Sequence, residues 1–123
     1  MRLFSRILFG ISALLLAVGA HFHTRAFGKT AAAVADSNLP AFLGNGFKVL
    51  WLQDSVITNL LAIVFAVVAI NQRAAPRWII IVLALAPIMT ACLVYYFIGN
   101  FYGGHVFLTA GIAAIVGALI KPD

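Results

Sequence analysis

The sequence predicts an all-α membrane protein with four transmembrane helices in an antiparallel bundle and a partly helical interfacial loop between the first two. Of its 123 residues, 64% are hydrophobic and only 9% are charged, whereas soluble domains average roughly 45–50% and about 25%. Several apolar runs approach the roughly 20 residues that cross a bilayer core. We therefore expect a single transmembrane domain over residues 1–123.

The first predicted helix covers residues 3–22. Its apolar centre at 7–20 follows the basic residues Arg2 and Arg6. A basic start before an apolar centre is also typical of a secretory signal peptide. A short membrane span is the alternative interpretation, and it is the one we adopt.

The segment over residues 24–46 is more polar and is predicted to lie in the membrane interface. Charged and polar residues interrupt short apolar stretches there, which favours a loop that is partly helical and lies along the interface. The triplet Gly44-Asn45-Gly46 is a natural break. We expect the second helix to follow it and to cover residues 47–70.

The second half of the sequence predicts a hairpin and a fourth span. A short polar connector at 71–77 separates the second helix from a third helix, which is expected over 78–98. So short a connector makes the two helices antiparallel neighbours. After Gly99-Asn100, a fourth helix is expected over 102–120.

The basic residues predict how the chain is oriented in the membrane. Four spans place both termini and the connector at 71–77 on one side, and more basic residues lie on that side than on the other. By the positive-inside rule, we expect both termini in the cytoplasm and a multi-pass protein of the bacterial inner membrane. The basic residues are Arg2, Arg6, Arg73, Arg77 and Lys121 on the first side and Arg25, Lys29 and Lys48 on the other.

The number and distribution of the basic residues also indicate which partners to expect. The formal charge is +5, which in a soluble protein would suggest nucleic acid. Here the basic residues are scattered singly at the ends of apolar runs, so no nucleic-acid partner is expected. The expected partners are the lipid bilayer and either other membrane-protein subunits or further copies of this chain.

Polar side chains of the second helix fall on one arc. At about 100° per residue, Asp54, Ser55, Thr58 and Asn59 share a face, and the opposite face is apolar except for Gln53. A hydroxyl or amide that faces hydrocarbon without a partner is costly, so Thr58 and Asn59 are expected to contact protein. A charge within a span marks a candidate functional residue. Asp54 is that candidate, unless it only anchors the helix near the outer boundary.

Small residues of the fourth helix predict a tight packing face. Ala110, Ala114 and Ala118 recur at every fourth position, and Gly117 lies beside them. Small side chains let helix backbones approach closely. We expect this face to be structural.

The histidines are candidate metal ligands that we weigh and set aside. His21, His23 and His105 are all expected on the outer side and, with Asp54, could supply nitrogen and oxygen ligands for zinc or copper. In a helix, however, His21 and His23 point to roughly opposite sides. No histidine lies well within the bilayer to hold a haem. We expect no metal and no cofactor.

Three functional hypotheses remain. The preferred one is a non-catalytic accessory or structural subunit packed on a larger membrane complex, because the spans hold few ionisable groups and carry small-residue faces. The first alternative is a small oligomeric transporter or channel with its polar path on the second helix. The second alternative is a membrane redox or metal protein that uses the outer histidines. The spans contain no acid–base pair, so no catalytic site is expected.

Overall fold

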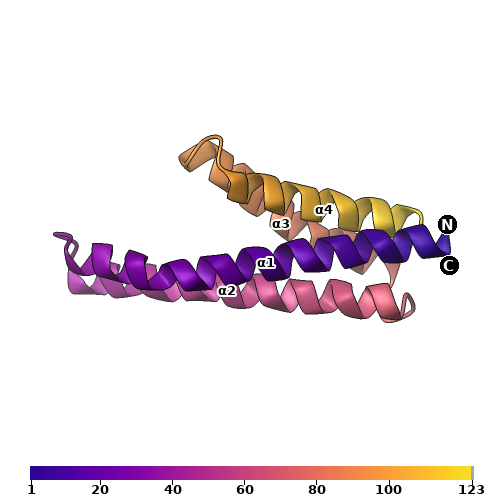
Figure 1. The fold of residues 1–123 in the computed structure, drawn as a ribbon, viewed down its shortest axis with the longest axis horizontal. Helices are drawn as coiled ribbons and strands as arrows, with labels where there is room; N and C mark the ends of the chain where they lie inside the picture. The colour runs from indigo at the N-terminus through magenta and orange to yellow at the C-terminus, as the bar shows by residue number, and fades with distance from the viewer. Residues whose placement is uncertain (123) are drawn as a thin grey trace.

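The computed structural model describes residues 1–122, and Asp123, the last residue of the predicted domain, lies outside the described residues. The described chain has no strand. Its four helices are all long and apolar enough to cross a membrane, which confirms the all-helical fold class and four candidate spans. The helices are α1 (Arg2–Ala35), α2 (Ala41–Ile70), α3 (Arg77–Phe97) and α4 (Tyr102–Leu119) (Figure 1).

The segment over residues 24–46 was expected to be a partly helical loop, but most of it belongs to the two long helices. α1 continues without interruption to Ala35, and α2 begins directly after Pro40. The end of α1 contains no proline and is rich in alanine, the strongest helix former, so nothing in the sequence stops the helix earlier. The predicted break at Gly44 lies inside α2. A Cβ atom added there would lie 3.0 Å from Val34 Cγ1, so the glycine lets α2 approach α1 closely.

α1 is the helix that joins the two halves of the molecule. It packs against α2 and against α4, and α4 in turn packs against α3. Near the start of α1, Arg6 Nε donates to the carbonyl of Ala69 at the end of α2 over 2.7 Å. Ser5 Oγ donates to the carbonyl of Gly117 near the end of α4, also over 2.7 Å. The start of α1 therefore lies beside the ends of both α2 and α4.

The core lies where α1 meets the small residues of α4 and the inner parts of α2 and α3. Contacts in it are close. A Cβ atom added to Gly111 of α4 would lie 2.5 Å from Ile88 Cγ1 and 3.0 Å from the carbonyl oxygen of Ala84, so the backbones of α3 and α4 nearly touch. The largest fully buried side chains of the core belong to Phe9, Leu16, Phe65, Val68 and Ile80.

The two helix pairs differ in length, and this difference shapes the molecule. α1 and α2 have 34 and 30 residues, whereas α3 and α4 have 21 and 18. At 1.5 Å per residue, the first pair is about 51 and 45 Å long and the second about 32 and 27 Å. Gly19 of α1 lies beside Val106, near the start of α4. The later part of α1 therefore passes beyond α4.

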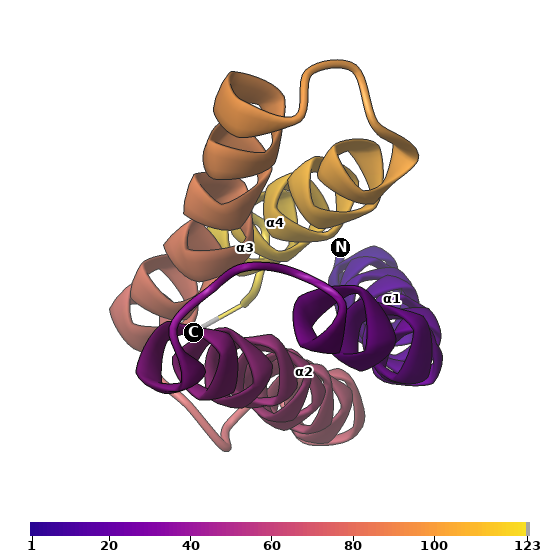
Figure 2. The same ribbon diagram turned by 90° about the vertical axis from the view of Figure 1, so that its left-hand side faces the viewer.

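We call residues 24–50 the projecting end. In Figure 1 it extends on the left, far from the start of α1 and the end of α4. Figure 2 looks at the molecule from that side, with the α1–α2 connection nearest the viewer. In both views the α3–α4 pair leans away from α1 and α2 towards this side. Within the projecting end, α1 and α2 pack against each other, as the close approach of Gly44 to Val34 shows.

Candidate functional site

The projecting end carries an apolar groove between α1 and α2. Its volume is about 440 Å³. Beside the groove, the tip of α2 presents Phe42 and Leu43 with 86% and 53% of their surfaces exposed. Exposed apolar patches mark sites of contact with a protein or a membrane. Residues that line the groove include Lys29, Ala33, Val34, Ser37, Leu39 and Phe47.

A cluster of side chains around His23 joins α1 to α2 at the base of the projecting end through ring stacking and hydrogen bonds. The His23 ring stacks on the Trp51 indole, with 4.1 Å between the ring centroids and 9° between the planes. Trp51 Nε1, which can only donate, donates to the backbone carbonyl of His23 over 3.0 Å. His23 Nδ1 lies 2.8 Å from Ser55 Oγ and 3.8 Å from Asp54 Oδ2. Both the side chain and the main chain of His23 are thus held by α2.

The predicted polar arc of α2 is divided between the α1 contact and the surface. Ser55 and Thr58 are buried, and the side chain of Asp54 is 41% exposed. Asn59 is exposed, and its Nδ2 donates to the carbonyl of Ser55 in the same helix over 3.1 Å. The expected contact of Asn59 with another helix is therefore not made within this chain, because its amide is satisfied by its own backbone. A transport path would need these polar groups on one open face, whereas Ser55 and Thr58 are covered.

The predicted packing face of α4 lies inside the chain. Ala110, Ala114 and Ala118 have no exposed surface, and Gly117 is also buried. A Cβ atom added to Gly117 would lie 3.2 Å from the Phe9 ring. Because α1 and α3 already cover this face, it cannot serve as the surface on which α4 meets another subunit.

The three histidines enter different contacts. His21 is exposed and meets only the edge of Phe22, while His23 belongs to the cluster with α2. His105 Nε2 donates to Asn100 Oδ1 over 2.8 Å, so its Nδ1 accepts from the Tyr95 hydroxyl, also over 2.8 Å. Within residues 1–122, no three His, Cys, Asp or Glu side chains are grouped as metal ligands.

Similarity to known proteins assigns this chain to no family. No protein-family model matches the sequence, and neither a curated protein nor a solved structure gives a significant match. The residues themselves must therefore indicate the function. The projecting end is the feature that most distinguishes this chain from a plain four-helix bundle, and it is the candidate functional site.

Proposed function

We propose that this chain is a multi-pass membrane protein whose helices cross the bilayer as an antiparallel bundle, with both termini in the cytoplasm. The length and apolar character of all four helices support insertion. The orientation follows from the basic residues at the end of the bundle where α1 begins, by the positive-inside rule. These residues are Arg2, Arg6, Arg73, Arg77 and Lys121.

Within the membrane, we propose a non-catalytic accessory subunit that binds a larger membrane complex through its projecting end. The observation that carries this proposal is the length of α1. A helix of about 51 Å would have to tilt by about 54° to fit a hydrocarbon core of about 30 Å, and transmembrane helices tilt by roughly 0–40°. Even at a tilt of about 40°, α1 would span about 39 Å along the bilayer normal, so part of the projecting end leaves the core and enters the outer interface.

The side chains of the projecting end suit a protein partner there. Phe42 and Leu43 at its tip are apolar and exposed, and covering them removes apolar surface from water. Three basic residues, Arg25, Lys29 and Lys48, lie on the two helices of the projecting end, and Lys29 lines the apolar groove. A partner surface with an apolar centre and an acidic rim would complement it.

The proposed orientation can be tested with reporter fusions. Reporters placed at Arg73 and after Pro122 should both report the cytoplasm, and a reporter at Asp36 in the α1–α2 connection should report the outside. The reason is the concentration of basic residues at the end of the bundle where α1 starts. A cytoplasmic signal from Asp36 would contradict the orientation.

The accessory role can be tested by purifying the protein in mild detergent with whatever it binds. The wild-type chain should purify with a larger membrane complex in fixed stoichiometry. The double variant Phe42→Ser/Leu43→Ser should lose at least about 90% of that complex, because loss of a central apolar contact typically costs 1–2 kcal/mol or more. Quantitative mass spectrometry of the purified material measures the ratio, and circular dichroism checks that the variant is folded.

A matched control removes equally exposed apolar residues from the opposite end. In Leu3→Ser/Leu119→Ser, the wild-type residues are 71% and 58% exposed, and this variant should keep the complex. If the wild-type chain purifies only as a homo-oligomer, the transporter hypothesis is favoured instead. A bound metal or pigment would favour the redox hypothesis.

A further inference from the structure

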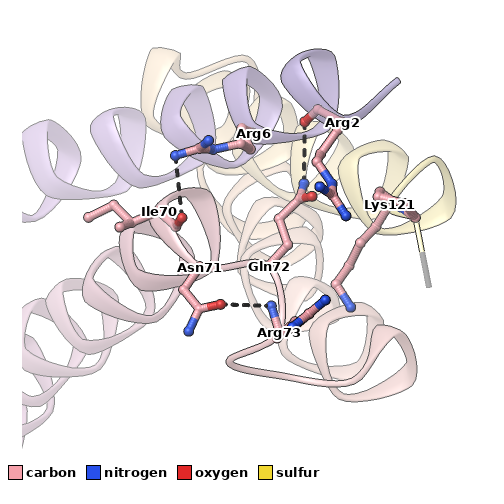
Figure 3. Close-up of a pocket in the computed structure, with 8 residues that line it drawn as sticks. Arg2, Arg6, Ile70, Asn71, Gln72, Arg73 and Lys121 are labelled. Atoms are coloured by element: carbon pink, nitrogen blue, oxygen red, sulfur yellow. Dashed lines mark hydrogen bonds between the residues drawn. The ribbon is translucent and has the colours of Figure 1, made fainter.

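The end of the bundle opposite the projecting end carries a pocket lined with positive charge. The start of α1, the connection between α2 and α3 and the end of α4 meet around it (Figure 3). Its volume is about 330 Å³, near the lower limit of the roughly 300–1,000 Å³ that ligand pockets occupy. The cationic residues that line it are Arg2, Arg6, Arg73 and Lys121.

The guanidinium of Arg6 is hydrogen-bonded to the backbone of α2. Its Nε donates to the carbonyl of Ala69 over 2.7 Å, and its Nη2 donates to the carbonyl of Ile70 over 3.3 Å. These are the last carbonyls of α2, where the helix dipole favours a positive charge. Arg6 therefore fixes the end of α2 against α1 and forms one wall of the pocket.

The other three cations face the pocket and have no acidic partner among residues 1–122. In Figure 3 the charged ends of Arg2, Arg73 and Lys121 lie around one space, and they come from three different segments of the chain. The acidic residues of the described chain, Asp36 and Asp54, lie towards the other end of the bundle. Three positive charges held together repel one another, and an anion between them would relieve this repulsion.

The pocket is organised before any ligand binds. Ser5 Oγ donates its hydrogen to the carbonyl of Gly117, so Ser5 must accept the hydrogen bond from Gln72 Nε2 over 2.8 Å. In the same connection, Asn71 Oδ1 accepts from the backbone N–H of Arg73 over 3.1 Å. The contact of Gln72 with Ser5, which is itself bonded to α4, thus fixes the segment that carries Arg73 and lowers the entropy cost of binding.

An apolar surface adjoins the charged pocket. Ile70 lines the pocket, and Val67 and Ile63 precede it on the same face of α2. These three side chains are 76%, 47% and 58% exposed. A ligand with a charged head and an apolar tail could place its head among the cations and its tail along this face. A soluble anion would use only the pocket.

We propose that this pocket binds the phosphate group of an anionic phospholipid. Arginine and lysine donate charge-assisted hydrogen bonds to phosphate oxygens, and the adjoining face of α2 suits the acyl chain. The proposed membrane orientation places the pocket at the cytoplasmic surface, where basic pockets meet anionic head groups. The lipid assignment rests on the proposed membrane insertion and orientation together with the geometry of the pocket, and not on the accessory role.

Native mass spectrometry of the full chain in detergent tests this proposal, with phosphatidylglycerol and phosphatidylcholine as probes. Phosphatidylglycerol should bind at least about tenfold more tightly than phosphatidylcholine. The variant Arg2→Gln/Arg73→Gln/Lys121→Gln should lose this preference, because each charge-assisted hydrogen bond typically contributes tenfold or more to affinity. The charge-retaining variant Lys121→Arg should keep the wild-type affinity, which separates loss of charge from loss of folding.

The matched control is Arg25→Gln/Lys29→Gln/Lys48→Gln, which removes the same charge from the projecting end. Its affinity for phosphatidylglycerol should stay within about twofold of the wild type. Equal losses in the two triple variants would overturn the pocket as a specific site. Inorganic phosphate that binds the wild-type chain as tightly as phosphatidylglycerol would overturn the lipid assignment in favour of a soluble phosphate ester. The variant Phe42→Ser/Leu43→Ser should bind lipid normally, so failure of the accessory role would be seen separately.

Discussion

Replacing Gly111 by leucine is expected to destabilise the protein by about 3 kcal/mol, the upper part of the range for overpacking a filled core. A Cβ atom at this position would lie 2.5 Å from Ile88 Cγ1 and 3.0 Å from the carbonyl oxygen of Ala84. The isoleucine side chain can turn away, but the backbone carbonyl belongs to the hydrogen-bonded ladder of α3 and cannot. α3 and α4 must therefore move apart. Thermal unfolding in detergent, followed by circular dichroism, measures the loss.

Gly28→Leu is the matched control. Gly28 is also helical, but no atom lies within 4 Å of the Cβ that leucine would add. This substitution should leave stability unchanged or raise it by up to about 1 kcal/mol, because glycine is a poor helix former. Equal destabilisation by the two substitutions would contradict the close contact between α3 and α4.

The ends of the two shorter helices could be predicted from the sequence because polar connectors bound them. The expected ranges 78–98 and 102–120 lie within a residue of α3 and α4. The connector before α3 contains Pro76, and Gly99 before α4 has a φ of 87°, a conformation that favours glycine. A residue that interrupts a helix is therefore present in the connector before α3 and in the connector before α4.

Polar residues within the segment 24–46 favour a loop, yet most of this segment is helical. Arg25 and Lys29 are compatible with a helix that has left the hydrocarbon, and only proline and the residues before it force a stop. From the sequence alone, Gly44 suggests that a helix is interrupted. In the structure it lies inside α2 and permits a close approach to Val34. Local propensity cannot distinguish these two uses of glycine, because the neighbouring helix decides between them.

The candidate site could be predicted only in part. The small residues of α4 indicate a packing face, and this face was counted in favour of an accessory subunit. The sequence does not show that α1 and α3 of the same chain cover it. Trp51 shares the polar arc of α2 with Ser55, which was the available signal for a contact with another helix. Its stacking partner, His23, could not be identified, because α1 was expected to end at residue 22.

Replacing Trp51 by alanine is expected to weaken the contact between α1 and α2 at the base of the projecting end. The substitution removes the stack on His23 and the hydrogen bond to the His23 carbonyl. It also removes a contact with Phe47, whose ring centroid lies 5.9 Å away. Truncation of a partly buried tryptophan and loss of its hydrogen bond should together cost about 2–3 kcal/mol. Amide hydrogen exchange over residues 24–35 should accelerate about 30- to 160-fold in consequence.

The effect of this substitution should be local because α4 does not reach the projecting end. The residues of α1 that follow His23 lie in the projecting end beside α2, whereas Leu16 and Phe9, which precede it, are packed in the core. Exchange at these core positions should therefore stay slow. Trp78→Ala is the control, since Trp78 is 66% exposed, and it should leave exchange over 24–35 unchanged. Equal protection of that segment in both tryptophan variants would show that contacts such as Gly44 against Val34 suffice to hold the projecting end.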